Sequence, residues 1–396
     1  MDKQEFLTKY TVERHGTSSQ KWDSMAERFG ESDLLAMWVA DMDFRTCDAI
    51  IDVLRGRVDH GVFGYPAVPD GYYEAFADWM RRRHGVAIGQ RWVRFCPGVV
   101  QALYWLVNAF TKPDDAVAIL TPVYYPFHNA VRDTGRRLVT VDLIDNHGYF
   151  VMDFASIEDA FRRTRPKMII LCSPHNPVGR VWTESELADI LALCDRYDVM
   201  PICDEIHQDI IIGPSLFVSA LNVADGAYRD KIIVLSAASK TFNVAGLVHG
   251  HIVIPSESLR AHYDTYAKTI NHAENSLLGM LATMAGYLHG DDWLDTVLGV
   301  IKDNYEYVKA ELAENVPEAV VCALEGTYLL FIDLRQCLRG EDSKAFIQDH
   351  CRLAVDFGEW FGDNFTGYVR LNLATHPKFI ETAIASIVRE AHRTAN

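Results

Sequence analysis

The chain has 396 residues, of which 49% are hydrophobic and 23% charged, and its formal net charge is −16. These proportions are those of an ordinary soluble globular protein and exclude intrinsic disorder. At this length we expect two packed units, or one large domain with a smaller one. The acidic balance argues against a nucleic-acid partner, which would require a basic patch.

Membrane insertion, secretion and a metal site are not expected either. No apolar run approaches the roughly 18 residues of a membrane-spanning helix, and the charged N-terminus lacks the apolar core of a secretory signal. The eight cysteines include no C-x-x-C pair, and several, such as Cys172 and Cys203, lie in apolar, strand-like runs. This usage favours buried, reduced thiols in a cytoplasmic protein and predicts no metal site.

The first part of the chain combines turns with helical patterns. Polar turns surround one compact apolar segment over 37–44. The spacing of apolar residues then predicts helices over 47–60, 70–84 and, after Pro97-Gly98, 99–110.

Four short apolar runs follow and predict buried strands, over 116–120, 167–173, 199–204 and 232–236, and a further strand is expected over 251–254. The four runs are continuously apolar rather than alternating, which is typical of strands covered on both faces. Between the second and third runs, Thr183 and Glu186 form a capping box that begins a helix. Strands that alternate with helices predict an α/β fold, with a mostly parallel sheet and helices on both of its faces.

Beyond about residue 290 the pattern changes to that of a smaller α+β unit. The spacing predicts, in order, a long helix over 291–315, short strands near 319–323 and 327–333, a helix near 342–350, a strand near 367–373 and a closing helix from about 377. We expect the N-terminal residues to join this unit, which makes it discontinuous in sequence.

Polar and ionisable residues follow the ends of the four buried strands. They are, in chain order, Tyr124, Asn176, Asp204 and Lys240. In open parallel sheets, ligands bind at the carboxyl ends of the strands, so these side chains are expected to gather at one edge. An enzyme that uses pyridoxal 5′-phosphate (PLP) needs a lysine for a Schiff base and a carboxylate that keeps the pyridine nitrogen protonated. It also needs a flat group on the ring and a donor to the phenolic oxygen, and the four residues fit these needs.

A phosphate cradle is expected at Gly98-Val99-Val100. This segment opens the predicted helix over 99–110, so its backbone N–H groups and the positive end of the helix dipole would face an anion.

Each of these residues also has a structural interpretation. A lysine after a strand is usually a solvated surface residue, and Asp204 could begin a helix, as Glu205 is expected to do. Tyr124 and Tyr125 could be packing aromatics, and a tryptophan such as Trp38 is more often core than site. The ordered set favours the cofactor, because a motif needs its predicted context.

These motifs resemble those of the fold-type I PLP enzymes of the class I/II aminotransferase superfamily, and most of all the MalY/PatB-type C–S lyases, its cystathionine β-lyase-like branch. The matching segments lie at 37–44, 64–66, 97–100, 121–127, 176–179, 204–207, 239–246 and 367–374. The resemblance implies a seven-stranded, aspartate aminotransferase-like large domain over 48–288. It also implies a smaller domain built from 1–47 and 289–396.

The resemblance implies that five residues contact the cofactor outside its phosphate group. Lys240 is implied to carry PLP as a Schiff base, Asp204 to face the pyridine nitrogen and Tyr124 to stack on the ring. Asn176 and His207 are implied to contact the phenolic oxygen.

The phosphate is implied to bind backbone and hydroxyl groups, those of Gly98, Val99, Val100, Ser236 and Ser239. Tyr65 resembles the tyrosine that reaches the phosphate of a neighbouring subunit, which implies a homodimer with shared sites. Many aminotransferases place a serine three residues before the lysine and an arginine eight after it. Here these positions hold Ala237 and Val248, which fits the lyase branch better.

For the substrate, Arg370 matches the arginine that binds the α-carboxylate, for which a bidentate guanidinium pair is the physical reason. Trp38 and Asp41 match a segment that lines the substrate pocket. Tyr125 and Asn176 are expected to contact the substrate as well.

The resemblance implies a PLP-dependent C–S β-lyase that cleaves L-cystathionine or related S-conjugates of L-cysteine to pyruvate, ammonia and a thiol. Lys240 would remove the α-proton, and Lys240 or Tyr124 would protonate the leaving thiolate. One alternative is an aminotransferase that uses the same residues on an L-amino acid. Another is a PLP-binding regulatory protein, for which no DNA-binding domain is visible. His249 and His251 receive no role.

Overall fold

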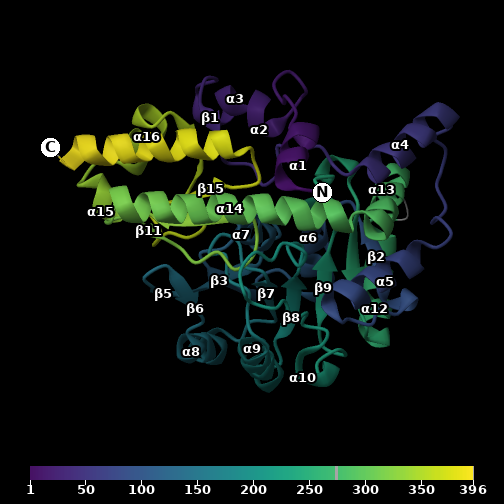
Figure 1. Ribbon diagram of the computed structural model, residues 1–396. Helices are drawn as coiled ribbons and strands as arrows, with labels where there is room; N and C mark the ends of the chain where they lie inside the picture. Colours follow the sequence, from purple (N-terminus) through teal and green to yellow (C-terminus); the bar gives the residue numbers. More distant parts are fainter. Residues whose placement is uncertain (273–274, 396) are drawn as a thin grey trace.

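The computed structural model describes residues 1–272 and 275–395, and its centre is a seven-stranded sheet (Figure 1). The strands lie in the order β2 (Val93–Cys96), β10 (Gly250–Val253), β9 (Ile233–Ser236), β8 (Met200–Asp204), β7 (Met168–Cys172), β3 (Ala116–Thr121) and β4 (Arg137–Asp142). Strand β10 is antiparallel to both neighbours, whereas β9, β8, β7, β3 and β4 pair in parallel. The predicted α/β fold with a mostly parallel sheet is confirmed.

Helices cover both faces of this sheet, because successive strand residues point to opposite sides. Val117 and Ile119 of β3 pack on the side of α6 (Val99–Phe110), α7 (Pro126–Arg132) and α12 (Glu257–Thr269). Ala118 and Leu120 pack on the other side. The helices there are α5 (Tyr72–His84), α8 (Phe154–Thr164), α9 (Glu184–Tyr197) and α13 (Leu277–His289). This double coverage explains why the strands are continuously apolar.

A second, antiparallel sheet is built from the C-terminal part of the chain. Its strands lie in the order β11 (Val320–Val321), β12 (Leu329–Asp333), β15 (Tyr368–Asn372) and β14 (Asp356–Phe357). The long helices α14 (Asp291–Asn315) and α16 (Pro377–Ala395) run side by side beside it (Figure 1). Strand β1 (Leu35–Ala36) pairs in parallel with β13 (Leu353–Ala354), which ties the N-terminal segment to this part of the molecule. The domain limits at 47/48 and 288/289 stay a prediction.

The remaining elements connect these layers. The helices among them are α1 (Lys3–Tyr10), α2 (Gln20–Asp23), α3 (Met25–Phe29), α4 (Asp48–His60), α10 (Val223–Gly226), α11 (Ala238–Thr241) and α15 (Arg335–Leu338). Strands β5 (Ile144–Asn146) and β6 (Tyr149–Val151) form a hairpin. Short helical segments of other types are η1 (Gln90–Trp92), η2 (Ala245–Leu247), η3 (Ala345–His350) and η4 (Gly358–Trp360). The helix expected near 342–350 is a six-residue π-helix, η3.

All eight cysteines are buried and none is paired in a disulfide. Within residues 1–272 and 275–395, no helix is both long and apolar enough to cross a membrane.

Candidate active site

The predicted site residues meet in a cavity of about 480 Å³ where β7, β8 and β9 reach their carboxyl ends. Ten of them line it, namely Gly98, Val99, Val100, Tyr124, Tyr125, Asn176, Asp204, His207, Ser239 and Lys240. The sheet topology therefore brings together residues that are up to 142 positions apart, from Gly98 to Lys240.

Lys240 lies in the short helix α11, directly after β9, and its Nζ donates a hydrogen bond of 2.6 Å to the carbonyl oxygen of Ala40. Burial, together with the charge of Arg370, outweighs the opposing effects of Asp41 and Asp204 and lowers the pKa of Lys240 to about 8. A neutral amine is therefore accessible near neutral pH.

Asp204 ends β8 and is 4% exposed. Its Oδ1 accepts a hydrogen bond of 3.0 Å from the amide of Ile206, but burial raises the pKa of the carboxyl to about 7. A cation opposite this group, such as a protonated ring nitrogen, would favour its ionised form.

Asn176 and His207 present polar atoms next to Asp204 and Lys240. Asn176 Oδ1 accepts from Arg370 Nη1 at 2.9 Å, and its side-chain amide N–H groups make no hydrogen bond within the described residues. His207 Nδ1 is buried without a partner, and burial lowers the pKa of this histidine well below its ordinary value. Both side chains can therefore serve a polar group inside the cavity.

Two neighbouring tyrosines form an aromatic wall. The rings of Tyr124 and Tyr125 lie 5.1 Å apart with an interplanar angle of 55°. The amide of Tyr124 donates to the carbonyl oxygen of Asn176 at 3.1 Å, which fixes the wall to the segment after β7. The phenol of Tyr124 is protonated at neutral pH, and burial raises its pKa further.

Helix α6 begins at one side of the cavity. Its N-cap, Gly98, supplies no side-chain cap, so the first amides of the helix are left for another acceptor. A larger residue at position 98 would crowd the cavity, because its Cβ would lie only 2.9 Å from Oε1 of Gln101, which lines the cavity. Together with Ser239, this arrangement suits an anion.

Arg370 lies in β15 and is 1% exposed. Besides Asn176, its guanidinium bonds the carbonyl oxygen of Trp38 at 3.0 Å and the carboxylate of Asp356. Asp356 is the register partner of Arg370 across β14 and β15, so both side chains lie on the same face of the small sheet. Burial raises the pKa of Asp356 against the lowering effect of Arg370 and Arg28.

The other predicted residues lie around the cavity rather than in its wall. The indole of Trp38 donates to the carbonyl oxygen of Lys21 at 2.8 Å, so only the Trp38 backbone reaches Arg370. Asp41 forms an ion pair of 2.8 Å with Arg14.

Two residues predicted to bind phosphate do not line the cavity in this chain. Ser236 is buried in β9, with its hydroxyl unpartnered, opposite His251. Tyr65 is 93% exposed in the segment between α4 and α5.

Sequence reasoning missed three features of the site: the Ala40 carbonyl against Lys240, Asp356 beside Arg370, and His249 in the cavity wall. The first depends on chain folding over 200 residues of separation. Asp356 could have been found only from the pairing of β14 with β15, which two-residue strands do not reveal.

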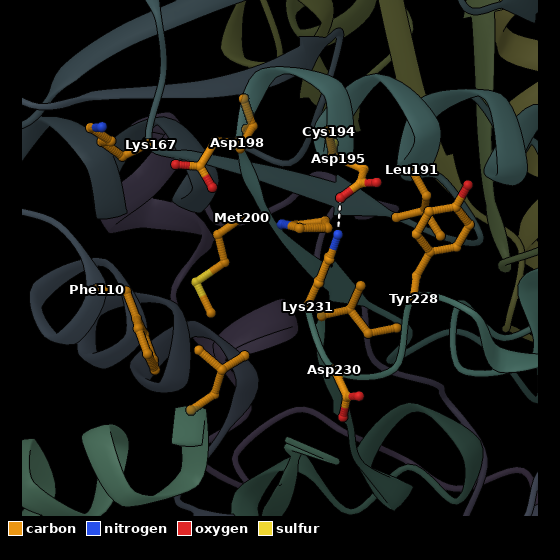
Figure 2. Close-up of a pocket in the computed structure, with 14 residues that line it drawn as sticks. Phe110, Lys167, Leu191, Cys194, Asp195, Asp198, Met200, Tyr228, Asp230 and Lys231 are labelled. Atoms are coloured by element: carbon orange, nitrogen blue, oxygen red, sulfur yellow. Dashed lines mark hydrogen bonds and ion pairs between the residues drawn. The ribbon is translucent and has the colours of Figure 1, made fainter. Parts of the chain in front are cut away.

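A second cavity, of about 360 Å³, lies at the opposite edge of the sheet (Figure 2). Lys167, Met200 and Ile232 line it, at or beside the starts of β7, β8 and β9. Figure 2 shows Lys231 paired with Asp195 across it. Because ligands of open parallel sheets bind at the carboxyl ends, the first cavity is the candidate active site.

The sequence model of the family described as aminotransferase class I and II matches residues 35–387. The chain belongs to this family. Within it, the chain is 34% identical to cystathionine beta-lyase PatB from Bacillus subtilis, over 91% of this chain and 93% of PatB. It is 33% identical to protein MalY from Escherichia coli, over 95% of this chain and 96% of MalY. The predicted resemblance to the MalY/PatB group is confirmed.

A solved structure supports the same fold and the same cofactor. Cystalysin from Treponema denticola, which contains pyridoxal 5′-phosphate, superposes with a TM-score of 0.92 at 33% identity and 98% coverage of both chains. The predicted PLP-type fold and the PLP cofactor are confirmed for this family member. The cavity fits PLP: Asp204 is a buried carboxyl that a ring cation would ionise, Asn176 has free amide N–H groups, and α6 opens on an uncapped N-terminus.

Proposed function

We propose that the protein is a PLP-dependent C–S β-lyase that cleaves L-cystathionine, or a related S-conjugate of L-cysteine, to pyruvate, ammonia and a thiol. The observation that carries the proposal is the shared cavity of Lys240, Asp204, Asn176 and Tyr124, with Arg370 bonded to Asn176. When bound, PLP supplies an electron sink for negative charge at the substrate α-carbon.

Lys240 and Asp204 have complementary tasks in this proposal. Lys240 holds the cofactor and, once released from it, removes the α-proton with its neutral Nζ, which the lowered pKa of about 8 supports. Asp204 keeps a proton on the ring nitrogen by presenting its carboxylate there.

Arg370 orients the substrate. Its guanidinium binds the α-carboxylate, and its bonds to Asn176 and the Trp38 carbonyl hold it in place for this contact. The Asp356 carboxylate has to yield part of its contact with Arg370 when the substrate carboxylate arrives.

Tyr124 protonates the leaving group. Its phenol carries a proton at neutral pH, as any tyrosine does, and in the proposal this proton passes from Oη to the departing sulfur. The C–S bond breaks, the thiol leaves with that proton, and water converts the remaining three-carbon fragment to pyruvate and ammonia. Ala237 and Val248, in place of a serine and an arginine, support the lyase rather than the aspartate aminotransferase branch.

The deciding experiment offers L-cystathionine to the PLP-loaded protein without any keto acid. We expect equal amounts of pyruvate and free thiol over many turnovers. Amino transfer that depends on an added keto acid, with no thiol released, would instead make the protein an aminotransferase.

Lys240→Ala tests the catalytic assignment directly. We expect turnover and the visible absorbance of the lysine-bound cofactor to disappear together. Lys231→Ala, at an exposed lysine outside the cavity, serves as the matched control and should keep both.

A further inference from the structure

Apart from Lys240, which is proposed to hold the cofactor ring, neither α11 nor the segment from Phe242 to Val248 carries a lysine or arginine for the phosphate. Ala237 and Val248 stand where many aminotransferases have a serine and an arginine for the phosphate. The backbone amides after Gly98 and the hydroxyl of Ser239 are thus left to hold a dianion. A further donor is expected on the remaining wall.

His249 occupies that wall. It lines the cavity together with Gly98 and Ser239 and is 6% exposed. It directly precedes β10, which lies between β2 and β9 in the sheet.

The strand register places His249 between the two predicted phosphate-binding segments. Gly250 pairs with Cys96 in β2, and His251 pairs with Ser236 in β9. His249 directly precedes Gly250, and it lines the cavity together with Pro97 and Gly98, which follow β2, and with Ser239, which follows β9. Gly279 of α13 packs against it from behind, since a Cβ there would lie only 2.5 Å from the His249 Cβ.

The hydrogen bonds around Tyr72 decide which nitrogen of His249 carries a proton. The Tyr72 hydroxyl lies 2.6 Å from Nε2 of His249 and 2.6 Å from Nε2 of His251. It has one proton to donate, so it donates to one ring and accepts from the other.

The second nitrogen of His251 resolves this choice. Buried His251 Nδ1 has no hydrogen-bond partner in the part of the chain that the structure describes, and an unpaired buried N–H is rarer than an unpaired buried acceptor. His251 is therefore protonated on Nε2 and donates to Tyr72, and Tyr72 donates to His249 Nε2. This leaves the proton of His249 on Nδ1, which makes no hydrogen bond within the described residues.

We propose that His249 Nδ1–H is a phosphate-binding donor of the cofactor site, oriented by Tyr72, in place of the absent arginine. Burial lowers the pKa of His249 to about 4, and a nearby phosphate dianion would raise it; in both protonation states Nδ1 carries a proton. This assignment revises the sequence interpretation, which gave His249 no role.

The test distinguishes binding of the phosphate from binding of the rest of the cofactor. Full-length protein freed of PLP is titrated with PLP and, separately, with pyridoxal, which lacks the phosphate, while the absorbance of the bound ligand is followed. For His249→Ala we expect the Kd of PLP to rise about tenfold or more, with the Kd of pyridoxal unchanged. His249→Asn, which places an amide N–H near the position of Nδ1, should recover most of the affinity, and the ³¹P resonance of the holoenzyme should shift in the alanine variant alone.

His251→Asn is the matched control, because His251 shares Tyr72 but does not line the cavity. It should leave the ratio of the two Kd values unchanged. An equal loss for PLP and pyridoxal in His249→Ala, or no loss at all, overturns the proposal. If the alanine variant does not fold, His249→Leu, which fills the space without a donor, gives the same readout. The inference concerns the cofactor alone, so a protein that binds PLP through His249 but releases no thiol leaves it intact.

Discussion

Arg370 divides its guanidinium among a side-chain amide, a backbone carbonyl and a carboxylate before any substrate arrives. A lysine keeps the charge but cannot reproduce this planar arrangement. We therefore expect Arg370→Lys to raise KM for the amino-acid substrate by about tenfold to a hundredfold, with the Kd of PLP unchanged. Steady-state kinetics and a PLP titration measure the two effects.

Arg335→Lys controls for the loss of an arginine fork elsewhere. Arg335 bonds the carboxylate of Asp333 at 2.9 and 2.7 Å on the small sheet, outside the cavity. The KM of Arg335→Lys for the amino-acid substrate should stay at the wild-type value. An unchanged KM in Arg370→Lys would remove Arg370 from substrate binding.

Asp204 makes the stability of the cofactor-free protein depend on pH. Its pKa is about 7 in the folded state and about 3.9 in an unfolded chain. Below both values the carboxyl is protonated in both states, and as pH rises towards 7 the unfolded state ionises first and stability is lost. Without PLP, we expect Asp204→Asn to raise the melting temperature at pH 8 and to have much less effect at pH 5.

Bound PLP should remove the higher melting temperature of Asp204→Asn at pH 8, because the ring cation of PLP offsets the cost of burying the Asp204 carboxylate. The measurement is thermal unfolding of both proteins at the two pH values, with and without PLP. A melting-temperature difference that does not change with pH would show that burial does not raise the pKa of Asp204 in the folded protein.

At the residue scale, the sequence predicted which residue types gather but not which atoms face the cavity. Lys240 and Asp204 could be identified because Asp204 ends a recognisable buried strand and Lys240 comes four residues after the end of another. The sequence could not show that His249 lines the cavity and Ser236 does not, since the direction of a side chain at a strand end depends on the register with two neighbouring strands.

Among the elements, the N-terminal segment is held by a buried ion pair. Lys21 of α2 bonds Asp43 at 2.6 Å, and both side chains are almost fully buried. Burial opposes ionisation of Asp43, but the charge of Lys21 and hydrogen bonds from Lys21 and Trp22 outweigh it and lower the pKa. This pair anchors the segment that carries Ala40 to the lysine of the cavity.

Lys21→Met leaves the Asp43 carboxylate buried with fewer partners. We expect it to lower the free energy of unfolding by about 3–5 kcal/mol, measured by urea denaturation. Lys3→Met removes the exposed pair with Asp303 and should cost at most about 1 kcal/mol. Equal losses in the two variants would show that burial adds nothing to the Lys21 pair.

Elements were predictable where burial alone sets the pattern. The apolar runs of β3, β7, β8 and β9 are buried along nearly their whole length, so composition reveals them. The edge strands β2 (Val93–Cys96) and β4 (Arg137–Asp142) were missed because they mix charged and apolar residues. The antiparallel direction of β10 follows from pairing between distant segments, which local patterns do not encode.

At the scale of the whole molecule, Tyr65 is the feature that a single chain does not explain. Tyr65 is 93% exposed, in a segment without regular secondary structure that includes the exposed residues Val62 and Phe63. The predicted homodimer with shared sites would place it at the phosphate of the neighbouring subunit. Tyr65→Ala alone and Lys240→Ala alone should then each have little activity.

Mixing the two variants under conditions that exchange subunits tests this prediction. A mixed dimer contains one site with its own Lys240 and an intact Tyr65 from its partner, so activity should rise well above that of either parent. Activity that stays at the sum of the parents would place each complete site within one chain.

The buried cysteines have a consequence for the proposed reaction, in which a thiol is one of the products. A released thiol, once oxidised, forms mixed disulfides with any protein thiolate it can reach. Here burial raises the pKa of Cys96 and Cys351 to about 12, and burial, with the nearby Asp204 carboxyl, also raises the pKa of Cys172, which borders the cavity. The folded protein thus presents almost no reactive cysteine to the thiol that the proposed reaction would release.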